Sequence, residues 1–448
     1  MPDSKLFIRL GSHSEKDYLL KTAKLFSGVI VGANLLESTP GATVSLALSL
    51  LGGAKIGFAV DPLTYTFGMD LSYIMSETLD RSSPIKGVRT WSLKKSFKGL
   101  AEQYGGVVKR VVVDNGSSIA PPDLSTAEIQ RLCTSVLEYQ LGRMRGVWVA
   151  DPQLRDVAAE FPDPSFVFSP YFYIPELPLS SSTSWEKATV EIAAAFGDLR
   201  SPVPKYSVAC FARSILRDTA RVRRLFNELS SNGCDGCWFW ISDLPEDRIQ
   251  AVELENLRLA IGIFQSRGKP LFNMHGGYLS AALSKHGLAG FSHGIGYGES
   301  KDVIPVVGVT VPTVNYHLPP LHTRVPMLEL ERALSSLGIT TAQEFHDRIC
   351  DCTICKGVLK EDLGNLREFG DFVLKVGNTR KSQTPDSAKR CRFHFLLARR
   401  KELDFVNGNT LSAIKNQMVQ ALQEYSSLPG YLNLSAKAGH LAVWDSGL

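Results

Sequence analysis

Short runs of β-branched and aromatic residues recur along roughly the first 300 residues of the chain, separated by stretches long enough to form helices. Several of these runs are apolar throughout instead of alternating with polar residues, which is typical of strands that are buried on both faces. The predicted strands are residues 28–33, 56–61, 111–114, 146–151, 165–169, 206–211, 237–241, 270–274 and 288–292.

Amphipathic helical patterns lie between the predicted strands. Residues 126–139, 218–229 and 248–264 each place apolar side chains along one side of a helix. Ser125 stands directly before the first of them, where its hydroxyl suits an N-cap. Strands and helices therefore alternate along this part of the chain.

This alternation predicts an α/β fold, and no glycine-rich phosphate loop follows the first predicted strand. We therefore expect a (β/α)8 TIM barrel over residues 25–325, preceded by an N-terminal segment of residues 1–24. A doubly wound open sheet is the alternative. In a barrel, functional side chains gather at the carboxyl ends of the strands, and Asp61 and Asp151 stand at such predicted ends.

Composition excludes several classes of protein. The chain has 448 residues, of which 44% are hydrophobic and 21% charged, close to the average of globular proteins. The net charge of +4 is too small to indicate nucleic-acid binding by itself. The most apolar stretch, residues 41–60, is interrupted by polar residues, and the start of the chain lacks the pattern of a secretory signal. We expect a cytoplasmic protein that does not enter a membrane.

Three cysteines lie close together at Cys350, Cys352 and Cys355. Zn²⁺ prefers four tetrahedral nitrogen or sulfur ligands, and this spacing supplies three of them at a small entropic cost. His394 is our choice for the fourth ligand, and Cys391 is its competitor. Because no open position is required, the site is predicted to be structural. Three ordinary buried cysteines are the alternative interpretation.

The remainder of the chain, residues 326–448, is therefore expected to form a zinc-binding helical subdomain. Within it, residues 375–401 contain nine Lys or Arg residues and a single acidic residue, Asp386. Such a basic loop favours contact with nucleic-acid phosphates, although a solvated protein face has the same composition.

The cysteine motif, its position after a predicted barrel and several strand-end segments together resemble the tRNA-guanine transglycosylase family, over roughly residues 25–400. In that family a CxCxxC motif and a later histidine hold structural zinc behind a (β/α)8 barrel. The segments at 28–34 and 57–61 are similar to the family's first strand and to the strand that ends in its pocket aspartate. Residues 270–277 and 287–292 resemble its last two strands.

The chain departs from the family pattern at the catalytic positions. Where the family has Asp-Ser-Gly-Gly-Phe, this chain has Asp61 followed by Pro-Leu-Thr-Tyr, and Ser292 and His293 stand in place of the nucleophilic aspartate of the last strand. The resemblance implies that Asp61 is the catalytic pocket aspartate. Because the last-strand aspartate is absent, our hypothesis is that Asp61 itself serves as the nucleophile, with His293 managing the proton. Asp61 also precedes a proline, so the alternative is that it only starts a turn. For His293, the alternative is a histidine with a structural role.

The substrate-binding residues that follow from the resemblance are Asp151, which would recognise the edge of the base, together with His275, Gly276 and Ser292. The nearest functional analogue is the DpdA-like branch, which inserts 7-deazaguanines into DNA. The implied activity is exchange of guanine for a 7-deazaguanine, such as 7-cyano-7-deazaguanine, through a glycosyl group linked to a carboxylate.

The resemblance also implies the partners. These are a nucleic acid, DNA before tRNA, and a free purine or 7-deazaguanine base. Accessory DNA-modification proteins or a second copy of the chain are the other partners that we expect. Because a base inside a duplex is unreachable, such an enzyme takes a single strand or flips the nucleotide out. A tRNA-guanine transglycosylase is one alternative, and a catalytically silent relative that binds nucleic acid is another.

Overall fold

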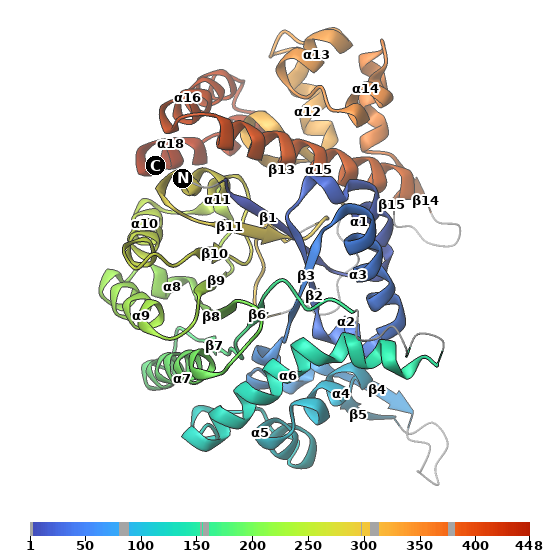
Figure 1. Cartoon of the computed structure of the whole chain (residues 1–448). Coiled ribbons are helices and arrows are strands. Elements are labelled where there is room, and N and C mark those ends of the chain that lie inside the picture. The colour runs from blue at the N-terminus through green and yellow to red at the C-terminus, as the bar shows by residue number, and fades with distance from the viewer. Residues whose placement is uncertain are drawn as a thin grey trace.

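Parallel strands follow one another around a barrel in the first two thirds of the chain (Figure 1). The computed structural model describes residues 3–79, 89–152, 155, 161–296, 298–304, 313–374 and 381–448. Within them the barrel strands, in chain order, are β1 (Lys5–Leu10), β2 (Gly28–Gly32), β3 (Gly57–Asp61), β6 (Val167–Phe168), β8 (Lys205–Ala212), β9 (Gly236–Ser242), β10 (Leu271–Asn273) and β11 (Gly290–His293).

Neighbouring strands pair in parallel in the spatial order β3-β2-β1-β11-β10-β9-β8-β6, and the short β7 (Tyr173–Ile174) also pairs with β8. The first and last strands are joined because β1 pairs with β11, where Ile8 lies opposite His293. The remaining seam is nearly closed, since the amide of Ser165, just before β6, donates to the carbonyl of Phe58 on β3 at 2.7 Å. The expected (β/α)8 barrel is therefore confirmed.

The barrel interior is filled by large side chains that alternate along the strands. Trp238 and Phe272 stack there at 4.7 Å between ring centroids, and Phe7 packs edge-on against Trp238. The opposite strand faces carry residues such as Ile8 and Phe291, which belong to a separate, larger apolar layer beneath the helices. This alternation decides which side chains can reach the barrel mouth.

Helices cover the outside of the barrel. They are α1 (Lys16–Thr22), α2 (Ala33–Ser38), α3 (Pro40–Ala54), α4 (Lys95–Tyr104), α5 (Gly106–Val108), α6 (Thr126–Ala150), α7 (Leu179–Asp198), α8 (Arg213–Leu216), α9 (Thr219–Ser231), α10 (Ala251–Ser266) and α11 (Tyr278–Ala282). A hairpin of β4 (Met75–Leu79) and β5 (Arg89–Leu93) projects from the segment after β3.

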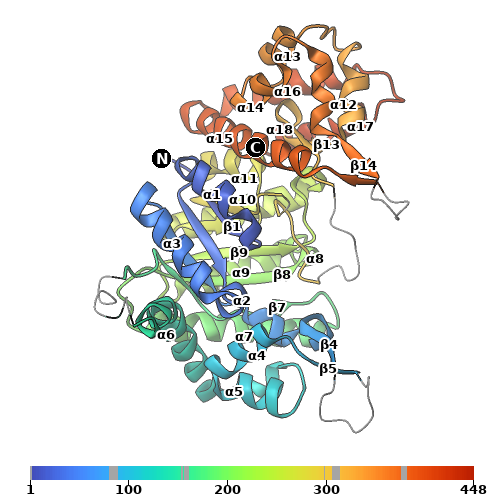
Figure 2. The same ribbon diagram turned by 90° about the vertical axis from the view of Figure 1, so that its right-hand side faces the viewer.

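The C-terminal region packs on one end of the barrel through the long helix α15 (Pro385–Gly408), which Figures 1 and 2 show between the barrel and the smaller helices. The other elements of this region are β12 (Tyr316–Leu318), β13 (Thr323–Val325), α12 (Met327–Leu334), α13 (Ala342–Arg348), α14 (Thr353–Leu359), β14 (Phe372–Leu374), β15 (Lys381–Gln383), α16 (Leu411–Ser426), α17 (Asn433–Lys437) and α18 (His440–Gly447). None of the described helices is long and apolar enough for a membrane span.

Two predicted strands are wrong. Residues 111–114 lie in a π-helical segment, Lys109–Asp114, and residues 146–150 form the last turns of α6. Val111 and Val112 are buried there all the same, because a short apolar run suits a buried helix as well as a buried strand.

The structure also contains a strand that the sequence interpretation left out. β1 lies within residues 1–24, which were expected to precede the barrel, and it pairs with both β2 and β11. The barrel therefore begins near residue 5 and not near residue 25. The predicted N-cap is confirmed, since the Ser125 hydroxyl accepts a hydrogen bond from the amide of Glu128 at the start of α6.

Candidate active site and metal centre

The three clustered cysteines and His394 meet in the C-terminal region. Cys352 caps the N-terminus of α14, Cys355 lies in its first turn, and His394 faces them from α15. All four residues are buried, and one ligand atom from each lies within 4.8 Å of the others. The helix start therefore presents the sulfurs toward a single point.

The geometry of this cluster fits a tetrahedral metal ion. Nδ1 of His394 lies 3.8, 3.4 and 3.3 Å from the sulfurs of Cys350, Cys352 and Cys355. A tetrahedral zinc site with Zn–S of about 2.3 Å and Zn–N of about 2.0 Å would separate nitrogen from sulfur by about 3.5 Å. The cluster can therefore hold a metal ion such as zinc.

The orientation of His394 is fixed from its other side. Its Nε2 donates to the carbonyl oxygen of His317 at 2.6 Å, and its ring stacks on Tyr316 at 4.1 Å between centroids. Because Nε2 carries the hydrogen in this bond, Nδ1 is left as the ligand atom. The competitor Cys391 lies outside the cluster and donates its thiol to the carbonyl of Phe369.

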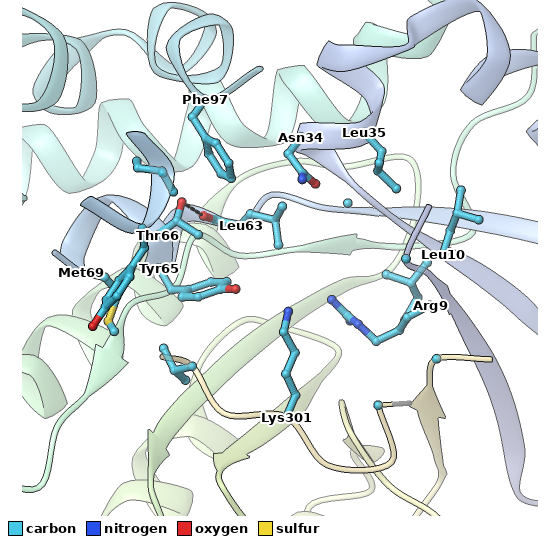
Figure 3. A pocket seen from close by; sticks show the side chains of 18 of the residues that line it. Arg9, Leu10, Asn34, Leu35, Leu63, Tyr65, Thr66, Met69, Phe97 and Lys301 are labelled. Carbon is cyan, nitrogen blue, oxygen red and sulfur yellow. Dashed lines mark hydrogen bonds between the residues drawn. The ribbon is translucent and has the colours of Figure 1, made fainter. Parts of the chain in front are cut away.

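A pocket of about 410 Å³ opens at the carboxyl ends of the barrel strands. Its walls come from β1, β2, α2, α4 and the segments after β3, β10 and β11 (Figure 3). The lining residues are Arg9, Leu10, Gly11, Ile30, Gly32, Asn34, Leu35, Leu63, Tyr65, Thr66, Met69, Tyr73, Ile74, Lys94, Phe97, His275, Gly294, Gly298, Lys301 and Val303. A pocket of this size accommodates a small molecule.

Asp61 ends β3 as expected and is fully buried beneath this pocket. Arg9 of β1 forms an ion pair with its Oδ2, and its Oδ1 accepts hydrogen bonds from the Tyr171 hydroxyl at 2.8 Å and from the amide of Leu63 at 3.1 Å. Both oxygens are thus engaged within the protein. Arg9, and not Asp61, contributes to the pocket lining.

Lys301 and Arg9 are the two cations that line the inner part of the pocket, whereas the third lining cation, Lys94, is exposed and donates to the carbonyl of Tyr73 at 3.1 Å. Figure 3 shows the two side chains pointing toward one another from opposite sides of the pocket floor. Burial, followed by the nearby charge of Arg9, lowers the pKa of Lys301 to about 8. The ammonium group lies 5.3 Å from the centroid of the Trp240 ring. No Asp or Glu lines the pocket within the described residues.

His275, a predicted substrate-binding residue, also lines the pocket, and its role in binding stays a prediction. Its Nδ1 donates to the carbonyl of Gly298 at 3.2 Å, so the lone pair of the neutral ring is on Nε2. Nε2 is buried and has no hydrogen-bond partner among the described residues. Burial, followed by the charges of Arg9 and Lys301, lowers the pKa of His275 well below its usual value.

The structure does not bring the other predicted site residues to this pocket. Ser292 faces the barrel interior and donates its hydroxyl to the carbonyl of Met274 at 2.5 Å. Gly276 donates its amide to the carbonyl of Ser292. Asp151 is exposed at the C-terminal end of α6, so its predicted position at a strand end is wrong. It therefore does not stand where a base edge in this pocket would be recognised.

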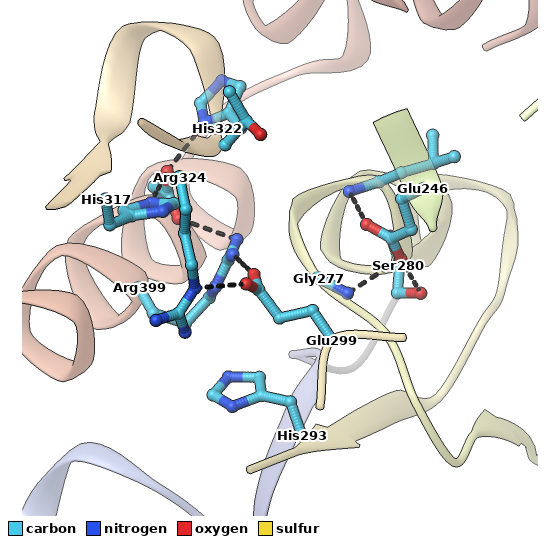
Figure 4. Close-up of polar contacts among 12 residues, drawn as sticks. Glu246, Gly277, Ser280, His293, Glu299, His317, His322, Arg324 and Arg399 are labelled. Atoms are coloured by element: carbon cyan, nitrogen blue, oxygen red, sulfur yellow. Dashed lines mark hydrogen bonds and ion pairs between the residues drawn. The ribbon is translucent and has the colours of Figure 1, made fainter. Parts of the chain in front are cut away.

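His293 is not paired with Asp61. It follows Ser292 on β11 and therefore points to the opposite strand face, where its ring packs against Phe395 of α15 at 5.0 Å between centroids. Figure 4 shows it beside Glu299 and Arg399, on the side of the C-terminal region. Burial, followed by the charge of Arg399, lowers the pKa of His293 to about 4. The expected role of His293 beside Asp61 is incompatible with this placement.

Sequence reasoning missed Arg9, Tyr171 and Lys301. Arg9 was detectable from the pattern around it. Leu6, Ile8 and Leu10 occupy every second position of an apolar run, and Phe7 and Arg9 stand between them. That pattern is typical of a strand with a charged residue near its carboxyl end. Neither Tyr171 nor Lys301 stands in a recognisable motif, since each is placed by a loop.

The predicted basic loop lies partly outside the described residues, at 375–380. The described remainder of the segment forms β15 and part of α15. Several of its cations are paired within the chain: Arg390 with Glu368, Arg399 with Glu299 and Glu402, Arg400 with Asp404, and Lys401 with Asp351. Contact of this segment with nucleic acid stays a prediction.

Comparison with known proteins adds no family assignment. No protein-family model matches the chain, and no curated protein sequence matches it.

Proposed function

We propose that the chain is a base transglycosylase that exchanges guanine for a 7-deazaguanine in DNA, with tRNA as the alternative substrate. The observation that carries the proposal is Asp61, a buried carboxylate at the end of a barrel strand, directly beneath a pocket of the size of a small molecule. The Cys3His cluster behind the barrel supports it, because this pairing is what the resembled family would have.

In this reaction the carboxylate of Asp61 attacks C1′ of the nucleotide, and the bond from C1′ to the base breaks. The leaving base takes a proton from a water molecule, which leaves a hydroxide ion. The incoming base then attacks C1′ and releases Asp61, and its own proton passes through the lone pair on Nε2 of His275 to that hydroxide, which restores water and the neutral imidazole. His275 replaces His293 in the proton-handling role, because His275 lines the pocket.

The proposal requires one local movement. Arg9 covers Asp61 and bonds to Oδ2, so its guanidinium has to turn away from the carboxylate when the nucleotide binds. Tyr171 and the amide of Leu63 still hold Oδ1 after that movement. Oδ2 is therefore the oxygen that attacks.

The metal of the Cys3His cluster is proposed to be Zn²⁺ in a structural role. Three thiolates and one imidazole fill a tetrahedral coordination sphere and leave no position for a substrate. Bound zinc would tie α14 to α15 and take no part in base exchange. We place the whole activity in the cytoplasm.

The test is incubation of the purified protein with labelled guanine or labelled 7-cyano-7-deazaguanine and either single-stranded DNA or tRNA. We expect incorporation of label into DNA, and a loss of at least about 100-fold with Asp61→Asn. Asp114→Asn is the matched control, because Asp114 is exposed and does not line the pocket. Activity that survives Asp61→Asn would contradict the assigned nucleophile.

A second candidate function is favoured by one specific observation. Both oxygens of Asp61 are engaged within the protein and no second carboxylate lines the pocket within the described residues, which suits a binding protein without catalytic activity. The same assay separates the two, since a silent relative would bind the nucleic acid or base and incorporate no label into either polymer.

A further inference from the structure

The pocket beneath the barrel mouth holds more positive charge than its own residues neutralise. Asp61 pairs with Arg9, and no hydrogen bond or ion pair joins the ammonium of Lys301 to any described residue. Nη1 of Arg9 is likewise buried without a hydrogen-bond partner among them. Apart from the exposed Lys94, which donates to the carbonyl of Tyr73, the two cations of the pocket therefore share a single carboxylate.

Such an arrangement is unfavourable without a ligand, because buried charges require a partner to offset their loss of hydration. Across the pocket from both cations, Figure 3 shows the apolar side chains of Leu63 and Phe97 and the ring of Tyr65, with the polar Asn34 and Thr66 between them. A ligand that suits both the cations and the opposite wall of the pocket has an anionic group at one end and a flat, apolar body.

We propose that Arg9 and Lys301 form the binding site of an oxyanion carried by an aromatic heterocycle in this pocket. The oxyanion is a carboxylate attached to the ring or the phosphate of a nucleotide, and both accept hydrogen bonds from a guanidinium and an ammonium group in the same way. The identification of the heterocycle as a purine or a 7-deazaguanine rests on the proposed function, whereas the oxyanion site rests on the two cations alone.

An oxyanion can bind while the ion pair between Arg9 and Asp61 is intact, and when Arg9 turns away from Asp61 for base exchange its guanidinium keeps its donors for the oxyanion. Arg9 uses Nη2 for Asp61, and its unpartnered Nη1 remains for the oxyanion. Lys301 supplies the second donor from the segment after β11. The site thus has two donors. The guanidinium of Arg9 is already oriented by Asp61, and the ammonium of Lys301 has no competing acceptor among the described residues.

The test is equilibrium binding to the full chain by isothermal titration calorimetry, with two pairs of ligands that differ in charge. The first pair is 7-carboxy-7-deazaguanine and 7-cyano-7-deazaguanine, and the second is guanosine 5′-monophosphate and guanosine. We expect the anionic member of at least one pair to bind at least about 10-fold more tightly, which corresponds to about 1.4 kcal/mol. A preference in the first pair identifies a ring carboxylate, and a preference confined to the second identifies a phosphate.

Lys301→Met is expected to reduce this preference to less than about 3-fold, and Lys301→Arg to retain most of it. Lys95→Met is the matched control, because Lys95 is exposed on α4 and does not line the pocket. Unfolding in urea checks that each variant is folded. Equal binding of both members in both pairs, or a preference that survives Lys301→Met, would overturn the proposal.

Failure of the oxyanion site and failure of the proposed transglycosylase activity give different results. Base exchange without any preference for an anionic ligand contradicts the oxyanion site alone. A clear preference that depends on Lys301, in a protein that incorporates no label into DNA or tRNA, contradicts the transglycosylase and leaves the oxyanion site standing.

Discussion

Arg9 on β1 reaches across the whole width of β2 to form an ion pair with Asp61 on β3. The pair lies below the pocket, with the Asp61 side chain fully buried and that of Arg9 only 13% exposed. It therefore links three neighbouring strands at the end of the barrel where the pocket opens.

Removing one member of this pair should destabilise the protein more than removing both. Arg9→Met leaves a buried carboxylate with two remaining donors, and we expect a loss of about 3 kcal/mol in the free energy of unfolding. In the double variant Arg9→Met with Asp61→Asn, neither position of the pair carries a buried charge. Urea unfolding of the wild type, both single variants and the double variant measures the coupling, and additive losses would show that the pair contributes nothing.

The four cluster residues, without Cys391, should determine metal content. Cys355→Ser is expected to reduce bound metal well below one ion per chain and to lower the melting temperature, because metal binding and folding are coupled in such sites. Cys391→Ser is the matched control, since its thiol bonds to Phe369 outside the cluster. Elemental analysis of both proteins makes the comparison. Loss of metal in the control as well would contradict the ligand assignment.

Stability should rise with pH between about 4 and 6.5 because of His293. The pKa of its folded-state imidazole is lowered to about 4 by burial and by Arg399, with Arg324 acting in the same direction and Glu299 against it. The unfolded chain therefore binds a proton in this interval that the folded chain does not. The contribution is complete above about pH 6.5 and is lost as the pH falls toward 4.

The variant that tests this is His293→Asn, whose amide can still donate to the carbonyl that Nδ1 now reaches, that of Gly294. The slope of unfolding free energy against pH should fall by up to about 1.4 kcal/mol per pH unit relative to the wild type. Urea unfolding at several pH values between 4.5 and 6.5, with both proteins in the same metal state, gives the two slopes. Parallel curves would count against a neutral buried imidazole.

Glu246 should hold the segment that positions His275. Its carboxylate accepts hydrogen bonds from the amides of Gly277, Leu279 and Ser280 and from the Ser280 hydroxyl, as Figure 4 shows in part. Because these donors would lose their acceptor, Glu246→Ala should reduce the free energy of unfolding by about 2 kcal/mol.

Asp247→Ala on the same short helical turn is the control for this effect. Asp247 is exposed, and among the described residues its carboxylate accepts only a long hydrogen bond from Thr323, so its loss should stay within about 0.5 kcal/mol. Thermal or urea unfolding of the two variants decides the point. Similar losses in both would indicate that Glu246 is an ordinary surface residue.

The barrel and the metal centre could be predicted from the sequence because local patterns determine them. Runs of buried β-branched residues identified most of the strands, and the spacing of Cys350, Cys352 and Cys355 identified the cluster. Where the pattern was ambiguous, the prediction failed. The valines near Val111 pack within a helical segment because tertiary contacts override the intrinsic preference of a short run.

The pocket could not be predicted to the same extent, because its charged groups depend on strand parity and on loops. A shift of one residue along β11 separates Ser292, which faces the barrel interior, from His293, which faces α15. Lys301 reaches the pocket from a loop without any sequence signal. Arg9 stood in an alternating run, but its strand was assigned to a segment before the barrel.

Helix α15 contributes side chains both to the cysteine cluster and to the ion pairs behind the barrel. It supplies His394 to the cysteine cluster, and one and two turns later it supplies Arg399 and Glu402 to buried ion pairs, with Arg399 reaching Glu299 behind β11. A truncated chain that ended at residue 325 would expose the Glu299 carboxylate and the apolar strand face beneath it. We therefore expect the barrel and the metal-binding region to unfold together, and the barrel to lose stability when it is transferred to another protein without α15.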